Sequence, residues 1–381
     1  MIIEIRKAGF RNKGAELMLL AALERLRSAY PDATLTMVPS GPDGEQPFDK
    51  VTALGMRPKA SLMRAGIDLG ALAGLVPGRL RCRYGLVLDR EVDVVLDLAG
   101  FAYSDQWGAG PSQDLARSAK RWRARGTKVV LMPQAFGPFT NQETRRAITS
   151  AVDNCDLVLA RDKVSYQHLT AVMGERESIR QYPDFTNLID GNVPEDYDPG
   201  VALVPNYRMI DKTGDTSGSR YIAFMSACVK RLLELDARPF MLIHEGQDDE
   251  RLAQQIAEAG GGIPIVTEND PLRIKGILGA SRAVVGSRFH ALVSALSQGV
   301  PAVATGWSHK YTELFEDYGF PEGVLSIDDD ASHVNATLDR IVGTNTGREL
   351  SAQLLEQSQR LKAVSEEMWS AVLAVIHSRG H

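Results

Sequence analysis

The sequence predicts an α/β protein with two doubly wound, Rossmann-like domains and a long C-terminal helix. Short apolar runs alternate with helical segments along almost the whole chain of 381 residues, which is typical of parallel sheets covered by helices on both faces. The alternation breaks between residues 182 and 200, where three prolines stand among glycines and acids. A chain of this length can form two domains, so we interpret residues 186–200 as the linker between them.

Five apolar runs predict the strands of an N-terminal domain over residues 1–185. These runs are 2–5, 34–38, 92–98, 128–132 and 157–160. Helical segments follow four of them, at 14–28, 113–125, 142–153 and 164–172. A strand that is followed by a helix and then by the next strand is typical of a mostly parallel sheet.

A second series of strands and helices predicts a C-terminal domain over residues 201–345. Its strands are expected at 201–204, 240–243, 263–266, 283–285 and 302–304, and its helices at 218–235, 248–259 and 271–279. Residues 346–381 are expected to form the C-terminal helix. Ligands of open α/β sheets bind beyond the carboxyl ends of the strands. We therefore expect a cleft between the two domains, lined by the loops that follow strands.

The composition argues against several classes of function. Hydrophobic residues make up 44% of the chain and charged residues 24%, the mixture of a soluble globular protein. A net charge of −5 argues against general binding to nucleic acids or anionic membranes, so an anionic ligand needs a local basic cluster. Three widely spaced cysteines form neither a disulfide framework nor a zinc site. Without a signal peptide or a membrane-spanning stretch, the protein is expected to be cytoplasmic.

The strongest candidate site follows the apolar run 283–285. Ser287, Arg288, Phe289 and His290 come where this strand ends and the next helix begins, and the free backbone N–H groups of such a turn favour anions. The guanidinium and the titratable imidazole predict chemistry on a phosphate or a carboxylate. The alternative is an exposed arginine and a packed histidine at an ordinary strand–helix turn.

Further basic residues follow other predicted strands. Lys13 could contact an anion beside Gly14, which would let the backbone approach a ligand closely. Arg161 follows the run 157–160 and could clamp an anion bidentately; its alternative is an ion pair with an acid of the other domain. Lys310 follows the strand at 302–304 and would add positive charge beside Arg288.

Other loops combine aromatic and hydrogen-bonding side chains that suit a sugar. Tyr103 and Asp105 lie in such a loop after the run 92–98; the alternative is a surface turn with Tyr103 packed beneath it. His244 stands at a strand end and could face the same ligand. The acids at 248–250 invite a metal hypothesis, but we interpret them as a helix start, where they complement the helix dipole.

In their order and spacing these segments resemble the polysaccharide pyruvyl transferase family. The resemblance covers nearly the whole chain. Its motifs are Asn12-Lys13-Gly14-Ala15-Glu16, Gln134-Ala135-Phe136-Gly137-Pro138-Phe139, Arg161-Asp162 with Ser165, Tyr182-Pro183-Asp184-Phe185, Pro205-Asn206 with Arg208, Ser287-Arg288-Phe289-His290, Gly299-Val300-Pro301, and Lys310.

The resemblance implies a GT-B-like fold and transfer of a pyruvyl group from phosphoenolpyruvate to a sugar of a polysaccharide or glycan precursor. The product would be a cyclic ketal, phosphate would leave, and no metal or further cofactor is expected. His290 would be the catalytic acid and base, together with Arg288. The implied donor-binding residues are Lys13, Gly14, Arg161, Ser287, Arg288, Phe289 and Lys310, and the acceptor side would be Tyr103, Asp105, Asn206 and His244.

Two alternatives stay open at this point. One is a nucleotide-sugar glycosyltransferase of the GT-B type, which usually carries a ribose-binding Glu five residues before the Gly of Gly-x-Pro; Ser294 stands there in this chain. The other is a non-catalytic protein that binds glycans or anions on the same fold. Residues 72–83, with leucines and three arginines, could lie against a lipid-linked acceptor as a peripheral membrane contact; a packed helix end is the alternative.

Overall fold

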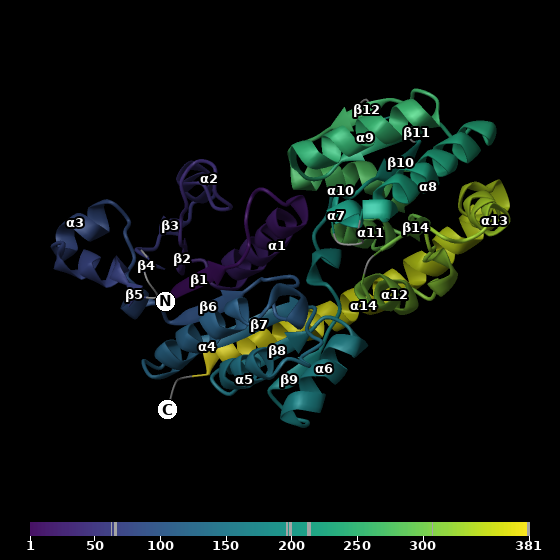
Figure 1. Cartoon of the computed structure of the whole chain (residues 1–381). Helices are drawn as coiled ribbons and strands as arrows, with labels where there is room; N and C mark the ends of the chain where they lie inside the picture. Colours follow the sequence, from purple (N-terminus) through teal and green to yellow (C-terminus); the bar gives the residue numbers. More distant parts are fainter. Residues whose placement is uncertain are drawn as a thin grey trace. The chain divides into compact units, whose positions relative to one another are not determined.

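The computed structural model describes residues 1–378 apart from 62, 65–66, 196, 198–199, 212–214 and 307. The chain divides into two compact units. The first comprises Met1–Arg11, Met18–Asp184 and Glu366–His381, and the second comprises Asn12–Leu17 and Phe185–Ser365. Each unit is built on its own parallel sheet with helices between the strands, as Figure 1 shows. This arrangement confirms the predicted fold class.

The sheet of the first unit has seven strands in the order β3-β2-β1-β6-β7-β8-β9, and all neighbouring pairs are parallel. The strands are β1 (Ile2–Arg6), β2 (Thr34–Met37), β3 (Arg57–Pro58), β6 (Val94–Asp97), β7 (Lys128–Gln134), β8 (Leu157–Ala160) and β9 (Ile179–Gln181). Every residue of β6 and β8 is buried, as expected for central strands that are covered on both faces. A short antiparallel pair, β4 (Met63–Arg64) and β5 (Ile67–Asp68), forms a separate sheet.

The predicted helices of this unit are present, and side-chain caps fix where several begin. Asp162 accepts a hydrogen bond from the backbone N–H of Ser165, and Asn141 accepts one from Glu143. Two short helices, Phe48–Ala53 and Gly78–Arg83, were not among the predicted helices. The helices are α1 (Lys13–Ala29), which begins in the second unit, α2 (Phe48–Ala53), α3 (Gly78–Arg83), α4 (Gly110–Arg123), α5 (Gln142–Val152) and α6 (Lys163–Met173).

The sheet of the second unit has five parallel strands in the order β12-β11-β10-β13-β14. These are β10 (Val201–Val204), β11 (Pro239–Ile243), β12 (Ile265–Thr267), β13 (Ala283–Gly286) and β14 (Ala302–Ala304). Because the strands are parallel, the loops after β10, β11, β13 and β14 leave the sheet at one edge. The helices are α7 (Arg208–Asp211), α8 (Asp215–Glu234), α9 (Gly246–Gly260), α10 (Pro271–Ala280), α11 (Phe289–Leu296), α12 (Lys310–Asp317) and α13 (Ala331–Val342).

The segment that the sequence predicts as a linker, 186–200, packs along α10 of the second unit where it is described. Lys275 is buried and donates a hydrogen bond of 3.0 Å from Nζ to the carbonyl oxygen of Thr186. The backbone N–H of Asn192 donates to the carbonyl of Leu272 at 2.8 Å. Gly191 and Gly276 permit the close approach, since an added Cβ on Gly191 would lie 2.4 Å from the backbone nitrogen of Gly276.

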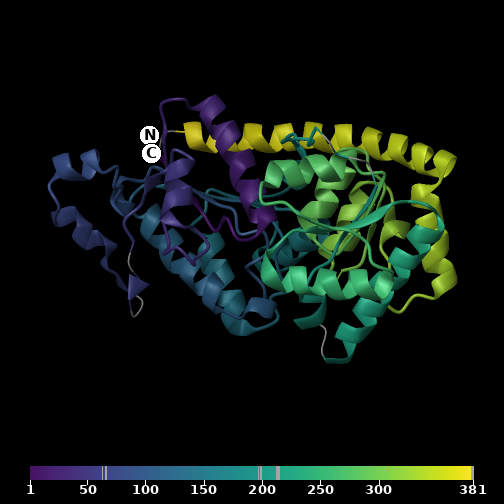
Figure 2. The ribbon, with the colours of Figure 1, turned by 90° about the horizontal axis from the view of Figure 1, so that it is seen from above.

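The C-terminal helix α14 spans Thr344–His377 and appears as one continuous yellow helix in Figure 2. It starts slightly earlier than the sequence predicts. Its residues up to Ser365 belong to the second unit and those from Glu366 onwards to the first. Buried side chains such as Leu354 and Trp369 line one side of it. Among the described residues, no helix is both long and apolar enough to cross a membrane.

Candidate functional site

Several predicted site residues meet at the carboxyl edge of the second sheet. His244 follows β11, Arg288 and His290 follow β13, and the first turn of α1 with Lys13 and Gly14 belongs to the same unit. Gly14 packs so closely on the imidazole that an added Cβ would lie 2.2 Å from Nδ1 of His290. The predicted close approach at Gly14 is therefore made to a protein side chain, His290.

Arg288 differs from the predicted donor clamp. Its side chain is only 10% exposed, and its Nε donates a hydrogen bond of 2.9 Å to Oδ2 of Asp249. Nη2 donates to the same carboxylate, and Nη1 donates to Glu245. The edge of the guanidinium that could hold a donor bidentately thus faces a protein carboxylate. The two acids outweigh the burial of the guanidinium, and its pKa is raised.

Asp249 is the organising residue that sequence reasoning missed. It is 1% exposed, and its Oδ1 accepts a hydrogen bond of 2.9 Å from the backbone N–H of Tyr207. Its carboxylate therefore connects the loops that follow β10, β11 and β13. Burial raises the pKa of Asp249, and the neighbouring Arg288 opposes this shift. The available signal was the spacing of Glu245 and Asp249, four residues apart at the start of a helix, where both can face one cation.

The turn before His290 is held by buried side chains. Ser287 shares a hydrogen bond of 2.8 Å with the hydroxyl of Tyr221, and its carbonyl accepts from Asn206 Nδ2 at 2.7 Å and from the hydroxyl of Tyr311 at 2.9 Å. Asn206 also accepts at Oδ1 from the backbone N–H of Arg208 at 3.0 Å. The side chains of Ser287 and Asn206 are thus engaged in internal hydrogen bonds that hold the turn, which the prediction of ligand contacts did not anticipate.

His290 and Lys310 are half-buried. His290 lies on the first turn of α11, and this helix has no side-chain N-cap among the described residues. The His290 ring meets the Phe289 ring edge-on, with 5.4 Å between the two ring centres. Lys310 opens α12, with Nζ 5.6 Å from the centre of the Phe289 ring. Phe289 itself is buried and offers little surface to a ligand. That Lys310 adds positive charge beside Arg288 stays a prediction.

His244 is held as a neutral imidazole. Its pKa lies well below the usual value, first because it is buried and then because Arg288, His290 and Lys13 are close by. Its Nδ1 has no hydrogen-bond partner in the part of the chain that the structure describes. A neutral ring with an open nitrogen can accept or donate one hydrogen bond.

The predicted site residues of the first unit make contacts within that unit. Arg161 is buried and forms an ion pair with Asp184, with 3.2 Å between Nη1 and Oδ2. An ion pair was the alternative considered for this arginine, but the acid comes from its own unit. The prediction of Arg161 as a donor clamp did not anticipate this partner, because Asp184 lies 23 residues further along the chain.

Tyr103 and Asp105 also have internal roles. Tyr103 is fully buried, and its hydroxyl donates to Oδ2 of Asp97 at 2.9 Å, so it cannot stack on an acceptor sugar. Asp105 accepts hydrogen bonds from the backbone N–H and the hydroxyl of Thr140 at 2.5 and 2.7 Å. The packed alternative for this loop is the one that the structure shows.

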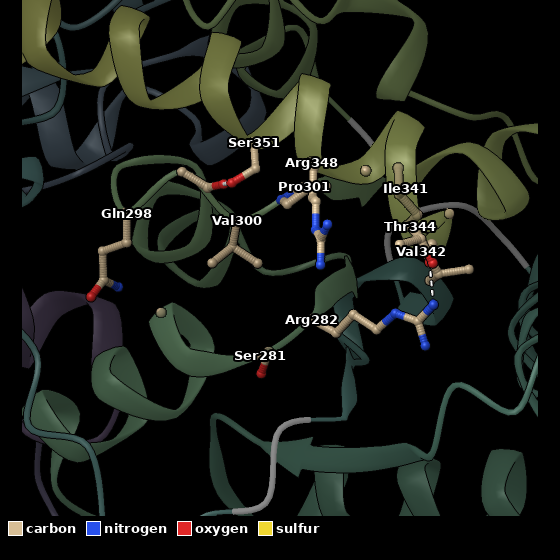
Figure 3. A pocket seen from close by; sticks show the side chains of 14 residues that line it. Ser281, Arg282, Gln298, Val300, Pro301, Ile341, Val342, Thr344, Arg348 and Ser351 are labelled. Carbon is tan, nitrogen blue, oxygen red and sulfur yellow. Dashed lines mark hydrogen bonds between the residues drawn. The ribbon is translucent and has the colours of Figure 1, made fainter.

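A pocket of about 560 Å³ lies at the opposite edge of the second sheet, before β13 and β14 (Figure 3). Arg282 donates to the carbonyl of Val342, and Gln298 donates to the carbonyls of Lys275 and Ser294. These side chains serve internal contacts, and the predicted site residues lie elsewhere. Among the residues described, no group of three or more His, Cys, Asp or Glu is arranged to hold a metal ion.

The site residues from Asn12 to His309 fall within one family match. Residues 12–309 match the family model described as polysaccharide pyruvyl transferase. The chain belongs to the polysaccharide pyruvyl transferase family. It is therefore a transferase, and the match includes the α1 turn, His244 and the 287–290 turn.

Solved structures share the fold at low sequence identity. HepE from Anabaena in complex with UDP and glucose has a TM-score of 0.60 at 13% identity, covering 98% of this chain and 99% of that one. A glycosyltransferase from Rickettsia africae has a TM-score of 0.61 at 12% identity, covering 99% and 98%. The UDP-GlcNAc 2-epimerase from Neisseria meningitidis bound to UDP-GlcNAc has a TM-score of 0.60 at 7% identity, covering 98% and 99%. This member of the family thus shares the GT-B-type fold of these structures.

Proposed function

We propose that this protein transfers a pyruvyl group from phosphoenolpyruvate to two hydroxyl groups of a saccharide acceptor, forming a cyclic ketal and releasing phosphate. The observation that carries the proposal is that His290 and Lys13 lie close to His244 at the carboxyl edge of the second sheet, in a member of the pyruvyl transferase family. Lys310 adds a cation beside the neighbouring Phe289. This edge is where open α/β sheets bind ligands.

The proposed donor is a strongly anionic molecule with a phosphate and a carboxylate. Asp249 and Glu245 offset the charge of Arg288. The electrostatic attraction for the anionic donor must therefore come from other groups. Lys310, Lys13 and the backbone N–H groups at the start of α11 are the candidates. Lys13 pairs with Glu16 at 2.8 Å, so a donor would compete with that carboxylate for the ammonium group.

The chemistry needs one acid and one base. In the proposed reaction both acceptor oxygens bond to C2 of the donor, C3 gains a proton and becomes a methyl group, and the bond from C2 to the phosphate oxygen breaks. Two hydroxyl protons are released: one balances the proton gained by C3, and the other leaves with phosphate. His290 is the candidate acid for C3. His244, being neutral, can accept a hydrogen bond from an acceptor hydroxyl.

A nucleotide-sugar donor is the competing hypothesis, because the solved neighbours include complexes with UDP and UDP-sugars. Nucleotide-sugar enzymes of this fold usually hold the ribose with a Glu at the position of Ser294. Ser294 has no carboxylate and is buried within α11. This favours phosphoenolpyruvate.

Calorimetric titration separates the two donors. The protein should bind phosphoenolpyruvate and should give no heat of binding with UDP-glucose or GDP-mannose under the same conditions. Saturable binding of a nucleotide sugar without binding of phosphoenolpyruvate would refute the proposal. Anion binding without phosphate release, over a panel of saccharide acceptors, would support a non-catalytic binding protein.

A further inference from the structure

The segment 69–88 of the first unit exposes large apolar side chains. It contains the 3₁₀ helix Leu69–Leu75 and α3. Leu75 is 83% exposed, Leu72 is 60% exposed and Leu80 is 45% exposed. Each of the six residues of α3 is at least partly exposed. Both overall views place α3 at the periphery of the first unit, away from its sheet (Figures 1 and 2).

The same segment is basic, although the chain as a whole has a net charge of −5. It contains Arg79, Arg81 and Arg83 and neither Asp nor Glu. Arg81 pairs with Glu91 at 2.6 Å, whereas Arg79 and Arg83 are exposed. Arg90 is exposed as well and passes close to the 3₁₀ helix: an added Cβ on Gly74 would lie 3.3 Å from its Nη2. Guanidinium groups therefore border the exposed leucines.

Leucines bordered by arginines fit the interface of an anionic bilayer. Contiguous apolar patches on a soluble protein mark interaction sites. The leucines can enter the boundary between headgroups and acyl chains while the arginines bind lipid phosphates. We propose that the surface formed by Leu72, Leu75, Leu80, Arg79 and Arg83 docks this protein on an anionic lipid bilayer. The proposal does not depend on the identity of the donor.

Charge favours this occupant over a second copy of the chain. A two-fold contact through this surface would bring the arginines of one copy against the same arginines of the other. An anionic bilayer instead supplies negative charge to all of them. Because no described helix is long and apolar enough to cross a membrane, the contact would be peripheral. If the proposed function also holds, docking would bring the enzyme to saccharides that are carried on lipids.

Sedimentation with vesicles tests the surface on the full chain. The parent should bind vesicles that contain phosphatidylglycerol and not vesicles of phosphatidylcholine alone, and added salt should weaken binding. Arg79→Gln with Arg83→Gln should weaken it about 25-fold, since each basic side chain near an anionic surface contributes about fivefold. Leu75→Ser with Leu80→Ser should also release the protein.

Matched controls come from the second unit. Leu233 and Leu355 are 44% and 47% exposed, close to Leu80, and Leu233→Ser with Leu355→Ser should leave vesicle binding unchanged. Arg348→Gln with Arg360→Gln removes two exposed arginines elsewhere. Melting temperatures verify that all variants are folded. Any one of three results would overturn the proposal. The parent does not bind anionic vesicles, or the control variants lose vesicle binding as much as the test variants do. The third is that the parent is a dimer and only the leucine variant is a monomer.

Discussion

At the scale of single residues, Asp249 and Arg288 form a buried ion pair in the candidate site. Asp249 offsets the charge of Arg288, the residue directly before α11, and α11 carries His290. Breaking a buried ion pair from one side leaves the other charge uncompensated, which is more costly than losing an exposed pair. Asp248, its neighbour on the same helix turn, is exposed and pairs with Arg251, so it provides an internal comparison.

Asp249→Asn should therefore destabilise the protein strongly, by about 3–5 kcal/mol. Asp248→Asn should change the free energy of unfolding by less than about 0.5 kcal/mol. Urea denaturation of the parent and both variants measures the difference. Equal stabilities of the two variants would show that the Asp249–Arg288 pair does not hold the second unit together.

The substitution His290→Gln tests whether His290 is the acid that protonates C3 of the donor. The amide keeps a hydrogen bond and loses the transferable proton, so turnover should fall on the order of 10²–10⁴-fold, while melting temperature and phosphoenolpyruvate binding stay near those of the parent. His309→Gln, on the neighbouring loop, is the control and should retain activity. A folded His290→Gln protein with normal turnover would remove this residue from the mechanism.

The lowered pKa of His244 predicts how the stability of the protein changes with pH. The pKa of His244 is lowered in the folded protein. Below about pH 6.5 the imidazole is therefore protonated in the unfolded chain and stays neutral in the folded protein. The free energy of unfolding falls as a result. Above that pH both states are neutral and the effect disappears. His244→Gln should lose about 1 kcal/mol less stability than the parent between pH 7.5 and pH 5.5. Parallel losses in the two proteins would mean that His244 titrates normally.

At the scale of elements, the start of α1 packs against the start of α11, where Gly14 lies against the imidazole of His290. Gly14→Ala should displace the imidazole of His290, because the new methyl group has no space beside Nδ1. Gly110, at the start of α4, has no heavy atom within 4 Å of an added Cβ and is the matched control. We expect Gly14→Ala to lower turnover at least tenfold and Gly110→Ala to leave it unchanged. If both variants are fully active, the contact between Gly14 and His290 is dispensable for catalysis.

Long periodic elements could be predicted from the sequence, whereas short ones could not. The strands β6 and β13 are continuous apolar runs, and the helices α4 to α6 show a clear helical period. By contrast, β3 and β9 contain only two and three residues, too few for a period to be recognised. Their position at the edges of the sheet is a tertiary property that local sequence does not record.

At the scale of the whole molecule, the parts of the candidate site that follow from the order of the parallel strands could be predicted from the sequence. Parallel strands bring the loops after β11 and β13 to one edge, so His244 and His290 were expected near a common ligand. The partners of Arg288, Arg161 and Tyr103 were not predictable. Arg288 and Arg161 each bind an acid 39 or 23 residues away, and Tyr103 binds Asp97 at the end of the preceding strand. The local sequence pattern gives no sign of these contacts.

Pyruvyl transfer from phosphoenolpyruvate can be tested by following the C2 carbon of the donor. The protein is incubated with donor labelled with ¹³C at C2 and a panel of saccharides, and the products are followed by ¹³C and ³¹P NMR. We expect a new ketal carbon on one class of saccharide and one inorganic phosphate for each ketal formed. An unchanged donor, together with glycosyl transfer from a nucleotide sugar by the same preparation, would contradict it.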